Sequence, residues 1–364
     1  MRILRNYTLK ELLFPFFLSL VIFTFVLLMG NIIKMADLVI TKGVNIVDIL
    51  HLLLWLAPYL LSFTLPMAVL TAVLLGFGRL SQDNEVLAMR ASGFSLYRIM
   101  FPIIIIGLIF SLFSFILNDR FIPQARYATR RIAKEIGFKN PASVLEPGTF
   151  IKAFEKYIIF VYKIKGNKLY NIRIYEPQEN RPTRTIIADR GEFIPLKDKE
   201  IIQLKLMDGT SDEPNPADPS SYYKLNFKTY YITLDLSQEQ DQQKVQKKLK
   251  DMSTDELRKE IKRLGQLDIN TIPALTEIYK KISMSFACLA FVVVGLPLAI
   301  KTKKTTKSIG FGISLLVILV YYLLFAGSEA LALRKVIRPE LAMWIPNAVL
   351  ITMGLILTYF TVER

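Results

Sequence analysis

Six long stretches of this sequence contain no charged side chain. They are residues 12–33, 52–78, 99–118, 282–300, 308–328 and 341–362. A helix needs about 20 apolar residues to cross the hydrocarbon core of a bilayer. None of the stretches alternates as the strands of a membrane β-barrel do. Because only helices and closed barrels satisfy their backbone groups in lipid, the sequence predicts six transmembrane helices. The first stretch is too long for a cleaved signal peptide, and no small-residue cleavage site follows it.

The charged residues are concentrated between the third and fourth stretches. Residues 119–275 hold 28 of the 46 Lys and Arg and 22 of the 31 Asp and Glu. This segment is therefore expected to be a water-exposed insert. We expect transmembrane helices 1–3 in residues 1–118, the insert in 119–275 and transmembrane helices 4–6 in 276–364.

The insert reads as mostly β structure. Runs such as YIIFVYKIK and YYKLNFKTYYITLDL are rich in β-branched and aromatic residues, and clusters such as QENRP, LKDK and SDEPNPADPSS separate them. About six short strands are expected, in a sandwich, a jelly roll or a curved open sheet. Helical segments at 125–136 and 253–264 flank the strands, and Ser253 with Glu256 fits a capping box.

Little in the chain suggests catalysis. Cys288 lies in an apolar stretch, and His51, the single histidine, lies at the edge of another. There is no GxSxG motif, no metal-ligand spacing and no phosphate-binding GxxxxGK[ST]. We therefore expect no catalytic residue, metal or cofactor on this chain. The net charge of +15 is spread along a membrane protein, so nucleic-acid binding is not expected either.

The distribution of cations suggests an orientation. With a cytoplasmic N-terminus, the short cytoplasmic segments hold eleven Lys and Arg and the short outer loops hold five. This bias favours cytoplasmic termini and an external insert. Six further cations flank the insert, and including them makes the counts equal. An excess of outer cations fits an anionic partner on that side, such as a phosphorylated lipid; a solvated basic collar is the alternative.

A short polar interruption, LSQDNEVLAMRASGFS, occupies residues 80–95. Read as one helix, it places Leu80, Leu87, Ala91 and Phe94 on a single stripe. Such a cytoplasmic helix could dock into the ATPase of an ABC transporter, with small residues permitting close approach and Glu85 offering a charge. A surface helix lying on the bilayer would have the same pattern.

Several segments resemble the lipopolysaccharide-export permease family (LptF/LptG type). GRLSQDNEVLAMRASGFS is similar to the family's cytoplasmic coupling helix. ILRNYTLKELLFPF and NIIKMADLV resemble its first helix, FTLPMAVLTAVLLGFGRLS its second and SMSFACLAFVVVGLPLAI its fourth. The resemblance extends over the whole chain, including the arrangement of three helices, an insert and three more helices. The segment around Lys34 resembles the G-type member of the family more closely.

The resemblance implies a fold and a set of partners. The fold is six transmembrane helices with a periplasmic β-jellyroll, in the bacterial inner membrane. The partners are a dimeric cytoplasmic ATPase that holds ATP and Mg, a second permease, a single-span periplasmic protein, a periplasmic bridge protein and lipopolysaccharide. Transmembrane helices 1 and 5 would line a shared cavity.

The expected site residues form three groups. For ATPase coupling they are Glu85, Leu87, Arg90, Ala91 and Gly93, within a helix at about 80–94. For lipid phosphates they are Lys34 and Lys42. For the lipid cavity they are Phe25, Leu28, Phe311, Leu315 and Ile318.

The function implied is extraction of lipopolysaccharide from the outer leaflet of the inner membrane and its delivery to the bridge protein. Two alternatives stay open on the residues alone. A non-transporting envelope scaffold or receptor would use the insert for protein binding and need no ATPase. A membrane-embedded enzyme acting on envelope lipids would need an intramembrane acid, for which Glu329 is the candidate. A co-purifying ATPase would separate these readings.

Overall fold

The computed structural model describes residues 2–139, 142, 145–154, 157–178, 181–196, 201–214, 222–235, 247–301 and 307–362. The predicted turn residues 197–199 and 215–221 lie outside this set. The chain forms two compact units. One comprises Met1–Met29, Trp55–Tyr127 and Lys247–Arg364, and the other comprises Gly30–Leu54 and Ala128–Gln246.

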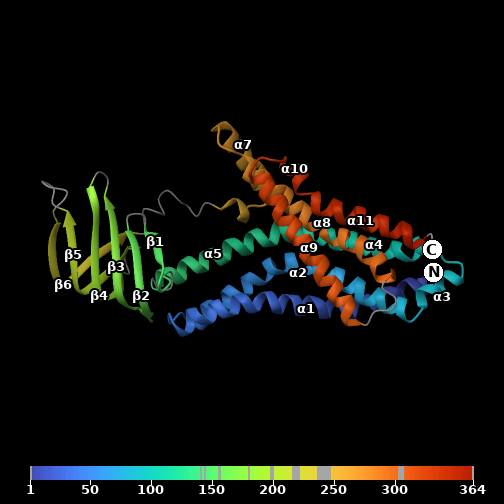
Figure 1. Cartoon of the computed structure of the whole chain (residues 1–364), viewed down its shortest axis with the longest axis horizontal. Coiled ribbons are helices and arrows are strands. Elements are labelled where there is room, and N and C mark those ends of the chain that lie inside the picture. Colours follow the sequence, from blue (N-terminus) through green and yellow to red (C-terminus); the bar gives the residue numbers. More distant parts are fainter. Residues whose placement is uncertain are drawn as a thin grey trace. The chain divides into compact units, whose positions relative to one another are not determined.

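The helices in chain order are α1 (Arg2–Ile40), α2 (Ile46–Gln82), α3 (Glu85–Ala91), α4 (Leu96–Ile116), α5 (Ile122–Lys139), α7 (Thr254–Gln266), α8 (Ile272–Lys301), α9 (Lys307–Leu333), α10 (Pro339–Ala342) and α11 (Ile345–Val362) (Figure 1). A π-helical turn, Leu117–Phe121, makes α4 and α5 continuous. Six helical stretches are long and apolar enough to cross a membrane, three before the strands and three after them. Four of the predicted stretches lie within one of them, and 308–328 and 341–362 each extend one residue beyond the matching one.

The core of the helical unit is built on α2 and α8. In their apolar stretches 78% and 72% of residues are buried, against 22% in α1 and 28% in α9. α8 packs between α4 and α11 (Figure 1). At Gly354 of α11 a Cβ would lie 2.7 Å from the carbonyl oxygen of Val293, so the two helices approach at backbone distance. α2 and α8 are thus the interior of the bundle, while α1 and α9 keep large apolar faces uncovered by this chain.

Polar side chains inside the bundle pair with one another. The Asn347 amide donates 2.7 Å to the carbonyl oxygen of Ser283, and the Tyr321 hydroxyl donates 3.2 Å to Asn347 Oδ1. The Thr24 hydroxyl of α1 donates 3.1 Å to Thr64 Oγ1 of α2. Because an unpaired polar group in an apolar interior is costly, these contacts favour one helix packing over others.

The capping box expected at α7 is present. The Ser253 hydroxyl accepts from the Glu256 amide, and the Glu256 carboxylate accepts from the Ser253 amide. Asp119, in the π-helical turn, accepts a 2.7 Å hydrogen bond from the Thr254 amide. Two carboxylates therefore accept from the Ser253 and Thr254 amides at the start of α7, where amides have no partner within the helix. The predicted flank 253–264 belongs to the helical unit.

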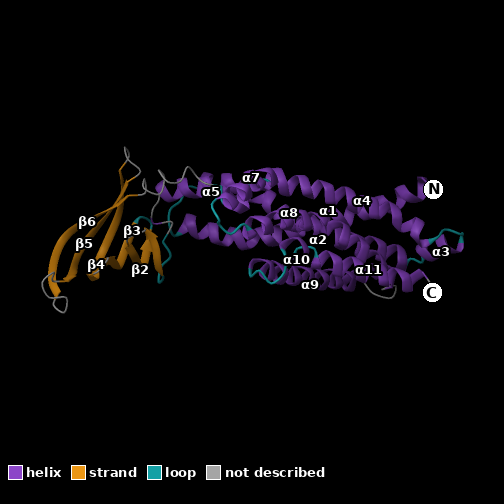
Figure 2. Ribbon diagram, turned by 90° about the horizontal axis from the view of Figure 1, so that it is seen from above, coloured by secondary structure: helices purple, strands orange, loops and turns teal. Residues whose placement is uncertain are grey.

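The second unit contains one antiparallel sheet. Its strands are β1 (Phe150–Phe154), β2 (Tyr157–Lys165), β3 (Lys168–Gln178), β4 (Arg181–Leu196), β5 (Ile201–Pro214) and β6 (Tyr222–Asp235), paired in sequence order (Figure 2). The number of strands agrees with the expectation. The jelly-roll connectivity differs, because every described strand pairs with its sequence neighbours and no strand crosses over. Of the expected sheet types, a curved open sheet fits this order.

The sheet buries one apolar face. Ile159 and Val161 of β2, Ile172 and Ile174 of β3, and Leu204 of β5 are among its buried residues. The alternation of buried and exposed residues shifts at two non-glycine residues with positive φ. These are Asn171 in β3 at 51° and Asp208 in β5 at 54°. The pairing register is the same on both sides of each residue, so the change of face occurs without a β-bulge.

Candidate functional site

The segment between α2 and α4 forms a separate short helix. Asn84, at φ 57°, interrupts the helical backbone before α3 begins at Glu85. At the other end Gly93 has φ 87°, its amide donates to the Arg90 carbonyl, and the Phe94 amide donates to the Met89 carbonyl. This is a Schellman ending, in which glycine occupies the left-handed position at lowest cost. Gly93, expected to allow close approach of a partner, therefore also ends the helix.

α3 has one buried face and one exposed face. Val86 and Met89 are buried and belong to the core of the bundle. Leu87 is 49% exposed, and Ala88 and Ala91 are exposed beside it. The structure thus leaves a small-residue surface with one large apolar side chain on this helix.

The predicted stripe of Leu80, Leu87, Ala91 and Phe94 is wrong. Leu80 is buried and lies near the end of α2, and the chain turns at Asn84 before Leu87. Phe94 follows the end of α3. The interruption at Asn84 breaks the periodicity that the stripe assumed.

Hydrogen bonds and ion pairs fix α3 and the end of α2 to the start of α1. The Tyr7 hydroxyl donates 3.0 Å to Glu85 Oε1. Arg79 forms an ion pair with Glu11 of α1, and its Nε lies 3.5 Å from Asp83 Oδ2. Charged pairs with partial exposure are individually weak. Here one hydrogen bond joins α3 directly to α1, and the Arg79 contacts join the end of α2 to α1 beside it.

The two cations expected to bind phosphate lie in different environments. Lys34 is exposed on α1. Lys42, just after α1, is only 6% exposed. The neighbouring Thr41 carbonyl accepts a 3.0 Å hydrogen bond from the Gly166 amide of the turn between β2 and β3. Lys34 is thus accessible to a ligand, whereas Lys42 is packed into the second unit.

The five residues expected to line a lipid cavity do not share one surface. Phe25 of α1 and Leu315 of α9 are exposed, and Leu28 is half-buried. Phe311 stacks on Phe23 of α1 with ring centroids 6.2 Å apart. Ile318 is buried in the bundle core, so it cannot line a surface of this chain without a rearrangement.

A cavity of about 590 Å³ lies among α1, α2 and α9. Phe14, Leu18, Leu75 and Phe311 are among its apolar lining residues. Lys10, Glu11 and Arg79 also line it. Of the five expected cavity residues, Phe311 is the one that reaches this space.

The sequence model of the family described as "Lipopolysaccharide export system permease LptF/LptG" matches residues 6–359. The chain belongs to this family. Its nearly complete coverage includes α1, α3, the sheet and α11. With six apolar helices, this LptF/LptG permease is a multi-pass protein of the inner membrane.

Two curated relatives have the same name. This chain is 26% identical, over 153 residues, to the lipopolysaccharide export system permease protein LptG of Escherichia coli strain K12 and to that of Escherichia coli O6:H1. Each alignment spans 42% of this chain and 41% of the relative.

Two features of this permease were not expected from its sequence. Tyr7 and Glu11 contact the region around α3, although they lie in the first turns of α1. The sequence does show that Tyr7 and Glu11 lie just before the uncharged stretch 12–33 and that Arg79 lies just after the stretch 52–78. If both stretches cross the membrane, these three residues lie at the same end of the helices. That signal does not give the partner, because Tyr7 and Glu85 are 78 residues apart.

Glu329, the acid considered for an intramembrane enzyme, has a partner. Lys280 Nζ of α8 lies 2.6 Å from Glu329 Oε1 of α9, with both side chains mostly buried. Glu329 of α9 is thus paired with a cation on the neighbouring helix α8. Among the described residues no group of three or more His, Cys, Asp or Glu is placed to hold a metal ion.

Proposed function

We propose that this chain is a permease subunit of an ABC transporter that extracts lipopolysaccharide from the outer leaflet of the inner membrane and passes it to a periplasmic bridge protein. The observation that carries the proposal is the exposed face of α3, with Leu87, Ala88 and Ala91, in a member of the LptF/LptG family. An apolar side chain between two small residues suits the groove of a protein partner.

In this mechanism α3 receives motion from a separate cytoplasmic ATPase. The ATPase binds ATP and Mg and performs the hydrolysis; this chain binds no cofactor. Arg90 and Gly93 complete the docking surface with Glu85, Leu87 and Ala91. An intramembrane enzyme would need an unpaired acid, and Glu329, the candidate, forms an ion pair with Lys280.

α1 transmits the motion. Tyr7 and Glu11 tie its first turns to the coupling region, and the helix continues without a break from Arg2 to Ile40. At 1.5 Å per residue its 39 residues extend about 58 Å. Lys34 lies on this same helix, near its far end, so α1 is the element that would link the coupling region to the proposed phosphate contact.

The lipid path uses the exposed apolar faces of α1 and α9. Phe25, Leu28 and Leu315 contact acyl chains, and Phe311 lies deeper between the helices. Ile318 joins the path only when α9 moves, because it is buried in this structure. A second permease faces the same surface and closes the cavity. Each methylene gains about 0.8 kcal/mol by burial, so a lipid with several chains requires ATP-driven closure to leave.

Lys34 is proposed as the phosphate contact at the outer end of α1. It is exposed, and charge-assisted hydrogen bonds from Lys to phosphate are strong. Lys42 contributes a second positive charge at longer range, since its packing limits direct contact. This assignment requires cytoplasmic termini and a periplasmic sheet.

The sheet domain receives the acyl chains on the periplasmic side. In this proposal the curved open sheet takes the role that the family resemblance gives to a jelly roll: it binds the single-span periplasmic partner and hands the lipid to the bridge protein. Its one-sided apolar core leaves two described outer strands, β1 and β6, as edges for such contacts.

The experiment is mass spectrometry of the complex purified gently from native membranes through a tag on this chain. The proposal expects a P-loop ATPase, a second six-span permease and bound lipopolysaccharide in the same preparation. Isolation of the chain in quantity with neither ATPase nor permease would contradict it and favour an envelope scaffold.

A further inference from the structure

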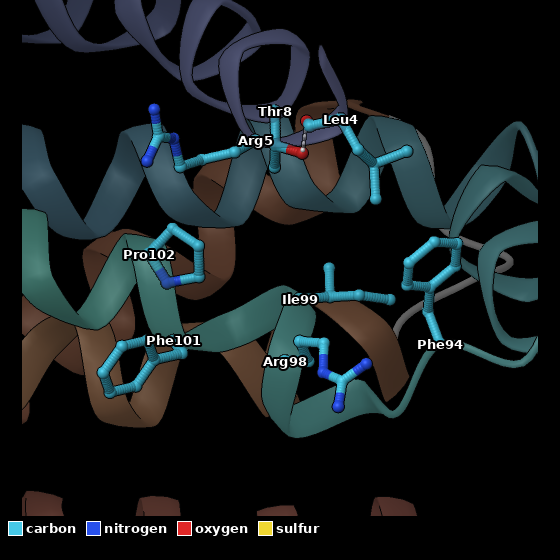
Figure 3. A pocket seen from close by; sticks show the side chains of 8 residues that line it. All are labelled: Leu4, Arg5, Thr8, Phe94, Arg98, Ile99, Phe101 and Pro102. Atoms are coloured by element: carbon cyan, nitrogen blue, oxygen red, sulfur yellow. Dashed lines mark hydrogen bonds between the residues drawn. The ribbon is translucent and has the colours of Figure 1, made fainter. Parts of the chain in front are cut away.

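A second, smaller cavity lies beside the end of α3 (Figure 3). It has a volume of about 240 Å³ and is formed between the first turns of α1 and α4. Leu4 lines it from α1, and Ile99 and Pro102 line it from α4. Phe94, from the link between α3 and α4, closes one end in the close-up view. The lining is therefore largely apolar.

Two arginines border this cavity. Arg5 projects from the α1 wall and Arg98 from the α4 wall (Figure 3). Both side chains are exposed, and neither forms an ion pair with any residue that the structure describes. The cavity thus combines an apolar interior with two uncompensated positive charges.

The acidic groups at this end of the helical unit are already engaged. Glu11 and Asp83 pair with Arg79. Glu85 accepts the hydrogen bond from Tyr7. None of these carboxylates pairs with Arg5 or Arg98 in the part of the chain that the structure describes, so a direct anionic partner for the two arginines would come from another molecule.

The surroundings of the cavity favour an amphiphilic anion over a soluble one. Phe101 lines the cavity and is 62% exposed, which suits contact with hydrocarbon. Arg98 directly precedes the uncharged stretch 99–118, so the cavity lies where the apolar core of the membrane meets its headgroups. The Thr8 hydroxyl donates 2.8 Å to the Leu4 carbonyl, which leaves the two guanidinium groups as the main donors to a ligand.

We propose that this cavity binds an acidic glycerophospholipid of the surrounding bilayer. Arg98 holds its phosphate through charge-assisted hydrogen bonds, and Arg5, whose guanidinium lies on the opposite side of the cavity (Figure 3), attracts the acidic headgroup at longer range. One acyl chain lies against Leu4, Ile99 and Pro102. This lipid remains bound as a structural ligand and is distinct from any lipid moved along α1 and α9.

Its position gives the bound lipid a regulatory role. Phe94 provides an amide to the Schellman ending of α3 and also lines the cavity. A lipid between α1 and α4 therefore braces the turn that carries α3. Occupancy of the cavity by the lipid should favour the position of α3 observed here. This consequence for coupling rests on the proposed function, whereas binding of the lipid does not depend on it.

Lipid retention by the full-length chain tests the binding. The chain is reconstituted in nanodiscs that contain phosphatidylglycerol and phosphatidylcholine, and retained lipid is measured by native mass spectrometry. Arg5→Gln and Arg98→Gln should each lower the retention of phosphatidylglycerol about fivefold, since a cation near an acidic surface contributes about that factor. Arg334→Gln with Arg338→Gln removes two exposed cations at the other end of the helices and should leave retention unchanged. Equal retention by the Arg5/Arg98 double variant and the wild type would overturn the proposal.

A photoactivatable phosphatidylglycerol provides a test without any variant. Crosslinks to the wild-type chain should map to residues 2–8 and 94–102, and unlabelled phosphatidylglycerol should reduce them. Crosslinks spread evenly over all apolar helices would overturn the site. Competition by inorganic phosphate alone would replace the lipid with a free anion as the ligand. Both assays omit the ATPase and lipopolysaccharide. They therefore test lipid binding even if the transport proposal is wrong.

Discussion

The Tyr7 hydroxyl donates a 3.0 Å hydrogen bond to Glu85, joining the first turns of α1 to the first residue of α3. Arg79 reinforces the same junction through Glu11. A force on α3 is therefore applied to α1 through side chains. The junction is where docking and helix movement can be separated experimentally.

Tyr7→Phe removes the hydroxyl and keeps the ring. We expect lipid transport per ATP hydrolysed to fall severalfold, because α3 loses a direct contact with α1. The melting temperature should change little, since the contact is exposed. The ratio of lipid transported to ATP hydrolysed is obtained from the transport and ATPase rates of the reconstituted complex. Tyr97→Phe, which alters an exposed tyrosine at the start of α4, is the matched control; an equal loss there would argue against a specific role for Tyr7.

Two substitutions of Glu85 separate its charge from its hydrogen bond. Glu85→Gln keeps an acceptor for Tyr7 and removes the charge, while Glu85→Lys reverses the charge and loses the acceptor. We expect a partial loss of export in the first and uncoupled ATP hydrolysis in the second, with the fold intact in both. Circular dichroism monitors the fold. Normal export by Glu85→Lys would eliminate this residue from the coupling surface.

Lys34→Glu should weaken lipid loading. Replacing a cation by an anion reverses its interaction with a phosphate, and we expect retained lipopolysaccharide to fall about tenfold or more. Crosslinking of lipopolysaccharide to α1 in the assembled complex reports the loading. Lys163→Glu makes the same charge change at an exposed position on β2. If both variants load lipid like the wild type, the phosphate contact lies elsewhere.

The close packing of α8 and α11 predicts a stability difference between two glycines. Gly354→Ala places a methyl group 2.7 Å from the Val293 carbonyl oxygen, which should cost about 1–3 kcal/mol. At Gly265 of α7 a Cβ meets nothing within 4 Å. Gly265→Ala should therefore be neutral or stabilise by up to about 1 kcal/mol through helix propensity. Thermal unfolding in detergent measures both, and equal stability of the two variants would contradict the packing.

The capping box at α7 predicts a dependence on pH. Burial raises the pKa of Glu256, but hydrogen bonds from Lys247 and from the Ser253 amide outweigh it, so the pKa is lowered overall. Because the folded-state value is below the unfolded one, the stabilisation is present at neutral pH and is lost as the pH falls through the lowered pKa. Ser253→Ala should cost about 1 kcal/mol at neutral pH. Glu256→Gln should remove the acid-dependent part, and an unchanged acid profile would contradict this assignment.

The six helices were predictable because uncharged stretches of that length have few alternatives. Their ends were not. α1 begins at Arg2, well before residue 12, and α2 continues to Gln82, since charged residues at a membrane surface can extend a helix as easily as end it. The strands followed from composition. The order of the strands in the sheet did not follow from composition, because pairing depends on which strand edges meet and not on the residue pattern within one strand.

The candidate site was predictable where it depended on local sequence. Gly93 and the small residues of α3 lie within a few positions of one another, and the resemblance assigned Glu85. The failures involve packing. Asn84 ends a helix that the stripe treated as continuous, Lys42 is buried within the second unit, to which it belongs, and Ile318 faces the core. None of these placements follows from residue type, since each depends on neighbours distant in the chain.

The hydrogen bond from Thr24 to Thr64 has a consequence for biosynthesis. Because the chain leaves the ribosome N-terminus first, α1 reaches the bilayer before α2, so at first the Thr24 hydroxyl can bond only to a carbonyl of its own helix. Insertion of α2 supplies Thr64, and the 3.1 Å hydrogen bond then joins the first two spans near the middle of each helix. The hairpin of α1 and α2 is thus held by an interhelical hydrogen bond before α8 is inserted at the centre of the bundle.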